Sequence, residues 1–155
     1  MRVKKYIPIL VLVTTLNFLF ASDNISNIDG EITLSKKLLN KKCNSLDKKL
    51  WLEGNVTYPN TTILNIYREN ILSFYFDPKP NIKEIQYLAD YEGKTCPTKG
   101  NCYDIEFKWL NDKNLLVQMH YPANKGSDED CESWLYEQNK ENVDVYHFIS
   151  WGLPD

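Results

Sequence analysis

The sequence predicts an α+β protein: a mainly antiparallel, meandering sheet of five to six strands, with one or two short helices packed on it and two disulfides bracing it. Three observations support this prediction. Apolar and polar residues alternate along several runs, turn-forming residues separate those runs, and the number of cysteines is even. Alternation with a period of two is typical of a strand with one buried face. An antiparallel sheet can keep its other face toward water.

The first 21 residues have the pattern of a secretory signal peptide. Three basic residues, Arg2, Lys4 and Lys5, precede an apolar run that ends at the small residue Ala21. The run that begins at Ile7 is 15 residues long, shorter than the roughly 20 residues that a transmembrane helix needs. A retained membrane anchor is therefore the weaker alternative. We expect a secreted or periplasmic protein that keeps no stable membrane span once the signal is removed.

The remaining chain has the length and charge of one acidic domain. Removing residues 1–21 leaves 134 residues, within the usual size of a domain, and changes the formal net charge from −3 to −6. A negative domain lacks the basic surface that binds phosphate backbones, so nucleic acid is not an expected partner. We expect a signal peptide over 1–21, a loosely ordered segment over 22–32 and a single α+β domain over 33–155.

Four cysteines follow the signal segment, and in an exported chain an even number favours disulfides. Four cysteines allow three pairings, which spacing alone does not decide. We favour Cys96 with Cys102 and Cys43 with Cys131, because the first pair brackets a turn-rich segment between two strand patterns. That segment would form a rigid protrusion at one end of the sheet, made of Pro97, Thr98, Lys99, Gly100 and Asn101.

In the first half of the domain, the apolar spacing changes from a helical to a strand-like period. Leucines and Cys43 recur at helical spacing, which predicts a helix over 33–43. Two runs rich in Ile, Leu, Phe and Tyr then predict strands over 61–67 and 71–76, with residues 68–70 as a hairpin turn.

The second half shows the clearest alternation. It predicts strands over 83–91, 103–109 and 115–121 and a last strand over 143–151. Between the last two, acidic residues followed by apolar residues at helical spacing predict a helix over 128–138.

Aromatic residues are the best indication of a binding surface. The chain has 10 Tyr and 4 Trp, and these side chains suit interfaces because each combines a large apolar body with a polar tip. Tyr146 and Phe148 are out of phase with the inward set of the last strand, so we expect them to face a ligand or partner. The alternative is that the second helix packs on them.

Catalytic and metal sites have little support in the sequence. His120 and His147 are the only histidines, and either could act with Glu106 or Asp104 as a general acid or base. No nucleophile motif accompanies them. The acidic residues over 128–132 match no EF-hand spacing. We therefore expect no cofactor and no metal.

Three sequons occur in the chain and would be glycosylated in a eukaryotic host. They are at Asn24, Asn55 and Asn60.

The function that best fits these features is an exported, non-enzymatic binding or inhibitor module. It would present the cysteine-closed loop and an aromatic surface to an extracytoplasmic protein partner. One alternative is a carrier of a small apolar ligand in a cavity of a curled sheet. The second alternative is a small secreted hydrolase that uses one of the histidines.

Overall fold

The computed structural model describes residues 24–28, 31–73, 76–79, 89–98, 101–124 and 127–150. Within these residues nine strands form one open antiparallel sheet in the order β1-β2-β3-β9-β8-β7-β6-β5-β4. The prediction of a mainly antiparallel sheet with few helices is confirmed, but the strand count is higher than expected. The strands are β1 (Ile25–Ile28), β2 (Glu31–Leu34), β3 (Trp51–Tyr58), β4 (Phe76–Asp77), β5 (Tyr91–Thr98), β6 (Asn101–Asn111), β7 (Asn114–Tyr121), β8 (Asp130–Asn139) and β9 (Asn142–Ile149).

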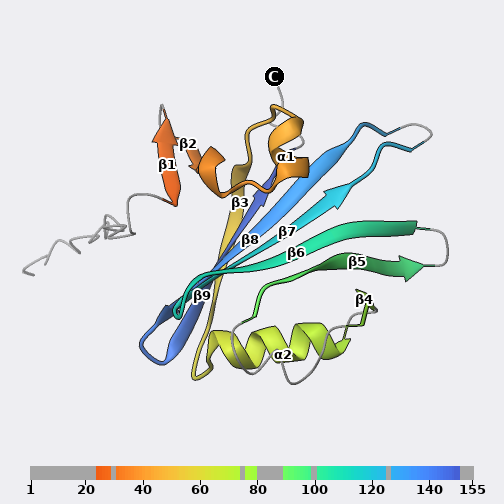
Figure 1. Cartoon of the computed structure of the whole chain (residues 1–155). Coiled ribbons are helices and arrows are strands. Elements are labelled where there is room, and N and C mark those ends of the chain that lie inside the picture. The colour runs from red at the N-terminus through yellow and green to blue at the C-terminus, as the bar shows by residue number, and fades with distance from the viewer. Residues whose placement is uncertain are drawn as a thin grey trace, which may run out of the picture.

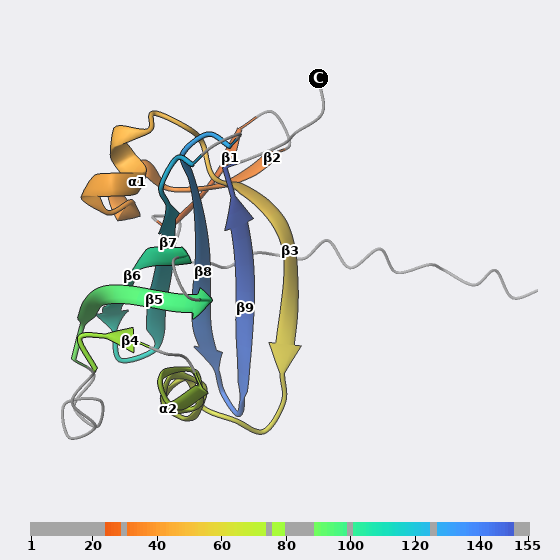
Figure 2. The ribbon, with the colours of Figure 1, turned by 90° about the vertical axis from the view of Figure 1, so that its right-hand side faces the viewer.

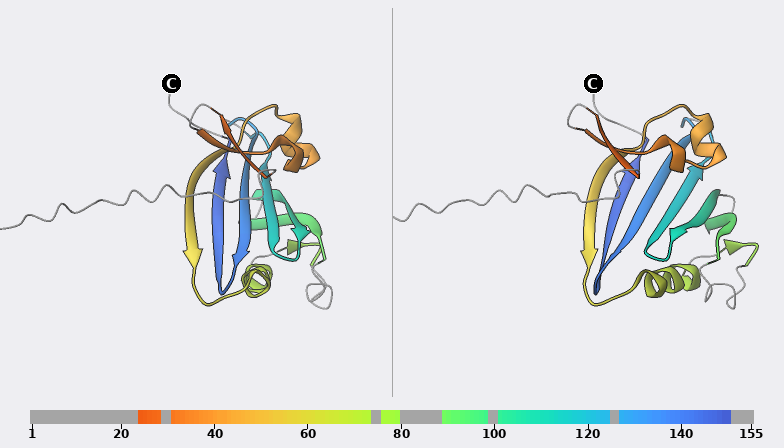
Figure 3. Two further views of the ribbon diagram at one scale, coloured as in Figure 1. Left: turned by 90° about the vertical axis from the view of Figure 1, so that its left-hand side faces the viewer. Right: turned by 60° about the vertical axis from the view of Figure 1, so that its left-hand side comes forward.

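Within the described residues three short helical segments accompany the sheet, two of them at one end of the molecule and the third at the other end (Figure 1). They are the 3-10 turn η1 (Lys36–Leu38), α1 (Lys41–Ser45) and α2 (Ile63–Ser73). The chain leaves β3 through α2 and reaches the far edge of the sheet at β4. From there each strand pairs with the next until β9 returns to β3, and the sheet twists strongly along this path (Figure 3).

One face of the sheet packs against α2. Ile63 and Tyr67, four residues apart on the helix, are 2% and 1% exposed and belong to a core with Phe107 and Val117. The ring of Tyr67 meets Phe107 edge-to-face at a centroid distance of 5.4 Å. We call this side of the sheet the α2 face.

The opposite face packs against the segment that contains α1. Leu34, Cys43 and Leu50 from this segment share a second core with buried side chains of the central strands. We call this side the α1 face. Because β7 has cores on both sides, its residues Leu115 and Leu116 are both buried, 1% and 0% exposed.

Three of the predicted strands are confirmed. The patterns over 103–109, 115–121 and 143–151 correspond to β6, β7 and β9, and a tight turn joins β6 to β7 as expected. The predicted strand over 83–91 reaches the described residues only at its end, where Tyr91 begins β5. Residues 80–88 lie outside the described part of the chain.

The prediction of a hairpin over 61–76 is wrong, because residues 63–73 form α2. The helix begins after Thr62, whose hydroxyl accepts a hydrogen bond from the Asn65 amide at 3.2 Å. The Ile63 amide donates to the side-chain oxygen of Gln138 on β8 at 2.9 Å. Ile and Tyr favour strands when isolated, but here burial of one helical face against the sheet decides the conformation.

The single helix predicted over 33–43 is also wrong. Residues 31–34 form β2, 36–38 a 3-10 turn and 41–45 a short α-helix. The Asn40 side chain caps α1 by accepting a hydrogen bond from the Cys43 amide at 2.9 Å. The apolar spacing arose because an irregular segment places all its apolar side chains on the same core.

The helix predicted over 128–138 is the strand β8. Cys131, Ser133 and Leu135 point to the α1 face and are 2%, 0% and 0% exposed. Trp134 and Tyr136 pack on the core of the other face. Since both faces of β8 are covered, apolar residues occur at consecutive positions and imitate a helical pattern.

The prediction of a loose segment over 22–32 missed the antiparallel β1–β2 hairpin, which pairs Ile25 with Leu34 and Ile28 with Glu31. Strand β3 was missed as well, because its polar residues gave no alternation. No helix in the described residues has the length and apolar character that a membrane span requires.

Candidate functional site

The expected loop is the tip of the β5–β6 hairpin, and a disulfide between Cys96 and Cys102 crosses it. This pairing, and that of Cys43 with Cys131, are the two favoured from the sequence. Thr98 pairs with the exposed Asn101, so the two strands extend beyond the disulfide. Pro97 lies in β5 beside Cys96, and Lys99 and Gly100 fall outside the described residues.

Tyr146 and Phe148 do not form a binding face, which corrects the prediction made for them. They are 4% and 0% exposed and belong to the core of the α1 face. The side chains that cover them come from the segment before β3, including Leu34 and Leu50, and not from a helix over 128–138. Burial rather than recognition therefore explains these two aromatic residues.

A groove of about 980 Å³ lies between the start of α1 and the outer strands β4, β5 and β6. Most of its lining side chains are charged, with both signs present. Two glutamates, Glu92 and Glu106, stand directly opposite each other on β5 and β6, an arrangement that is unfavourable without a neighbouring cation. The charged lining residues are Lys41, Lys42, Asp77, Glu92, Lys94, Asp104, Glu106 and Lys108.

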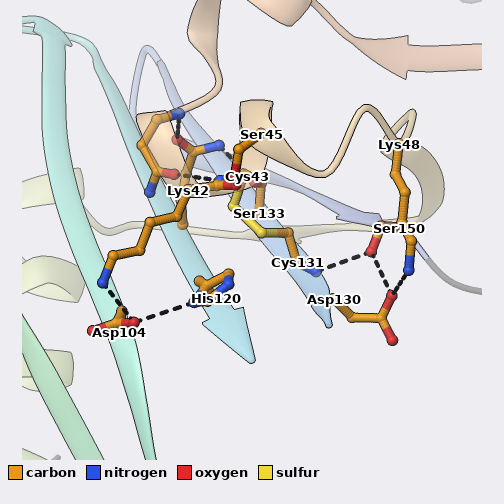
Figure 4. Close-up of a disulfide and its surroundings, with 12 residues drawn as sticks. Lys42, Cys43, Ser45, Lys48, Asp104, His120, Asp130, Cys131, Ser133 and Ser150 are labelled. Atoms are coloured by element: carbon orange, nitrogen blue, oxygen red, sulfur yellow. Dashed lines mark hydrogen bonds and ion pairs between the residues drawn. A yellow bond between two sulfur atoms is a disulfide. The ribbon is translucent and has the colours of Figure 1, made fainter. Parts of the chain in front are cut away.

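The wall of this groove contains an ion-pair network that crosses from α1 to the sheet (Figure 4). Asp104 on β6 accepts from the Lys42 ammonium at 2.7 Å and bonds to Nδ1 of His120 at 3.1 Å. The other ring nitrogen, Nε2, is 2.5 Å from a carboxylate oxygen of Glu129. Burial alone would raise the pKa of Asp104, but the hydrogen bonds from Lys42 and His120 outweigh it and lower that pKa.

This network is poorly arranged for hydrolysis. His120 is 5% exposed, and a carboxylate occupies each of its ring nitrogens. A general base needs a ring nitrogen that can reach a substrate or a water molecule. All four cysteines are in disulfides and none is free as a nucleophile. The sequence had named Asp104 as a partner for His120, but it gave no signal for Lys42 or Glu129.

The Cys43–Cys131 disulfide and a second ion pair hold the other end of the α1 segment on the sheet (Figure 4). Lys48 bonds to Asp130 of β8 at 2.6 Å, and the Ser150 hydroxyl donates to the same carboxylate at 3.2 Å. One wall of the groove is thus tied to β6 and to β8 by independent contacts.

A second histidine cluster lies on the α2 face. His147 contacts two carboxylates, with Nδ1 2.6 Å from Glu53 and Nε2 3.4 Å from Glu132. Its ring stacks on Trp134 with a centroid distance of 4.8 Å and an interplanar angle of 5°. Burial and the Glu132 carboxylate also raise the pKa of Tyr121, so this cluster holds its charges in a partly dry environment. Glu106 contributes to neither histidine cluster in the contacts described.

We predict that His147 titrates above its ordinary pKa of 6.5, because the hydrogen bond and charge of Glu132, with the charge of Glu53, stabilise its protonated form. The resulting stability is complete below pH 6.5 and is lost as the pH rises through the raised pKa. An NMR titration of the imidazole measures this directly. The variant Glu132→Gln should lower the pKa.

The control for this titration is Glu141→Gln, which changes an exposed carboxylate in the turn between β8 and β9 and should leave the pKa of His147 unchanged. A wild-type pKa at or below 6.5 would contradict the prediction. The titration is preferable to pH-dependent unfolding, because burial and the Asp144 carboxylate raise the pKa of Glu137 to about 7. The ionisation of Glu137 therefore also lowers the stability of the folded protein as the pH rises.

Among the described residues no group of three or more His, Cys, Asp and Glu side chains is arranged to hold a metal ion. The charged groove offers little to the apolar ligand of the carrier hypothesis. Two sequon asparagines, Asn55 and Asn60, are exposed, and Asn24 is half-buried.

No family model, curated protein or solved structure matches this chain.

Proposed function

We propose that the protein is an exported, non-enzymatic binding or inhibitor module that presents the tip of the β5–β6 hairpin to an extracytoplasmic protein partner. Export is supported by the signal-peptide pattern over residues 1–21 and by two disulfides, which are compatible with an oxidising, extracellular location.

The observation that carries the proposal is the position of the Cys96–Cys102 disulfide. Neither cysteine belongs to the two core clusters of the described residues, and their sequence separation is only 6. The antiparallel pairing of β5 and β6 already brings these positions together. The bond therefore restrains the conformation of the tip more than it supports the core. A loop restrained before binding loses less conformational entropy when a partner orders it.

The groove supports the same proposal, because the parts of β5 and β6 that lie farther from the hairpin tip line it. Lys94 and Lys108 on β5 and β6 provide positive charge, and Glu92 and Glu106 provide negative charge. Complementary charges around a contact set partner choice and association rate more than affinity. A partner that binds the tip would also contact this neighbouring surface of mixed charge.

The test is affinity capture from the native extracellular or periplasmic fluid, followed by measurement of the affinity for the captured protein. The loop variant combines Lys99→Ala and Gly100→Ala. We expect it to weaken binding at least roughly tenfold, which corresponds to about 1.4 kcal/mol.

The matched control combines Asp112→Ala and Lys113→Ala, which change two exposed residues in the turn between β6 and β7. Its affinity should stay within about twofold of the wild type, because this turn lies at the other end of β6. Equal affinity of the loop variant and the wild type would remove the tip from the binding site.

A further inference from the structure

Among the described residues, strand β3 has an outer edge without a strand partner over most of its length. It pairs with β9 from Trp51 to Tyr58, but on its other side β2 pairs with it only at Trp51. Beyond Trp51 the described part of the chain supplies no strand for this edge, and Figure 2 shows β3 at the margin of the sheet below the β1–β2 hairpin. Such an edge presents free amide and carbonyl groups that can pair with another strand.

The side chains on this edge are also unusual. Val56 and Tyr58 are the exposed large hydrophobic residues of the described chain, each 47% exposed. They lie opposite Val145 and Val143 of β9 and therefore on the α2 face, together with Gly54. A side-chain carbon added at Gly54 would meet nothing within 4 Å, so there is open space above it.

The regular part of the edge is short and has a defined centre. A bulge interrupts the pairing with β9 between Leu52 and Gly54, and Pro59 follows the end of β3 at Tyr58. Proline lacks the amide hydrogen that a ladder needs. Five residues, Gly54 to Tyr58, remain between these limits, and Val56 is the middle one.

We propose that two copies of the protein pair along this edge, β3 against β3 in antiparallel orientation, with a two-fold axis at Val56. Val56 of one copy then lies opposite Val56 of the other. Tyr58 of each copy lies over Gly54 of the other copy, where the missing side chain leaves room for the ring. On the other face Asn55 lies opposite Thr57. The register places no like charges opposite each other, because Glu53 is the only charged residue of β3.

The expected dimer is weak. A strand edge of five residues buries less than the roughly 1,200 Å² of stable complexes, so a dissociation constant between about 10 μM and 1 mM is expected. The edge lies far in strand order from the β5–β6 hairpin. The proposal is therefore independent of the binding function, and a dimer would carry two hairpin tips.

The test uses the fact that a residue on the two-fold axis faces itself. Wild-type protein should dimerise reversibly in sedimentation equilibrium up to about 1 mM. Val56→Lys and Val56→Glu should each be monomeric, because like charges would meet across the axis. An equimolar mixture of the two variants should form a heterodimer. The control Lys140→Glu, an exposed change in the β8–β9 turn, should dimerise like the wild type.

Several outcomes would overturn the proposal: a wild-type protein that stays monomeric to about 1 mM, variants that dimerise like the wild type, or a mixture that stays monomeric. If the wild type dimerises but the mixture of the two variants stays monomeric, the dimer contact lies elsewhere on the protein. Amide hydrogen exchange of the wild type gives a reading that needs no variant. Protection of those amides from Gly54 to Tyr58 that point away from β9 should rise with protein concentration, and unchanged protection of these amides would also count against the pairing.

Discussion

Replacing Cys43 and Cys131 by alanine is expected to lower the free energy of unfolding by about 4.6 kcal/mol. The bond joins residues 88 positions apart, so it removes much of the chain entropy of the unfolded state. Both cysteines are 2% exposed in the core of the α1 face. The same chain-entropy relation gives about 2.4 kcal/mol for a bond over the 6-residue separation of Cys96 and Cys102.

Urea unfolding of the two double-alanine variants, followed by tryptophan fluorescence, compares these effects. The variant without the tip disulfide should lose at most about half as much stability as the other. It should also keep the fold of the core, because the β5–β6 pairing holds the tip in place. If removing the tip disulfide lowered the free energy of unfolding as much as removing the core disulfide, or more, this assignment of roles would be contradicted.

The second large effect is expected for Phe148→Ala, with a loss of about 3 to 5 kcal/mol. Phe148 is fully buried and packs in one cluster with Leu116 and Leu135. Removing the ring leaves a cavity that neighbouring strands, fixed by ladders on both sides, fill poorly. Chemical denaturation gives the value.

The matched control is Tyr58→Ala, which removes another aromatic ring at a position that is 47% exposed. It should cost less than about 1 kcal/mol, because little packing is lost at an exposed site. If Phe148→Ala were as mild as this control, the burial of the last strand would be in error.

The sequence predicted those strands best in which alternation and turns agree. In β6, Ile105 and Phe107 are buried while Lys108 is exposed, as the period of two requires. The turn at residues 111–114 was also expected. These features are local, since side chains of successive residues in a strand always point to opposite faces.

Where contacts with distant segments decide the conformation, the sequence pattern gave the wrong prediction. Residues 63–73 are rich in strand-forming residues, but docking Ile63 and Tyr67 on the sheet makes them a helix. Strand β8 is covered on both faces, so Trp134 and Leu135 are neighbours in sequence and belong to different cores. A pattern of apolar residues does not reveal how many faces of an element will be covered.

The candidate site was predictable only in part. The cysteine spacing indicated the hairpin tip, and Asp104 was named as a partner for His120. Lys42 reaches the same carboxylate only because α1 folds onto β6 from 62 residues away in the chain. The register of β5 on β6, which opposes Glu92 to Glu106, is likewise a long-range result.

The sequence by itself determined the class of the sheet and the three alternating strands, because these follow from local periodicity and from short turns. It favoured the two disulfide pairs without deciding them, since four cysteines allow three pairings. Tertiary structure alone decided the helix α2, the burial of Tyr146 and Phe148, and the charged groove. It also decided the edge of β3 that lacks a strand partner beyond Trp51 in the part of the chain that the structure describes. Each of these depends on which distant segment covers a face or an edge. That choice is set by the total apolar surface buried and not by any local pattern.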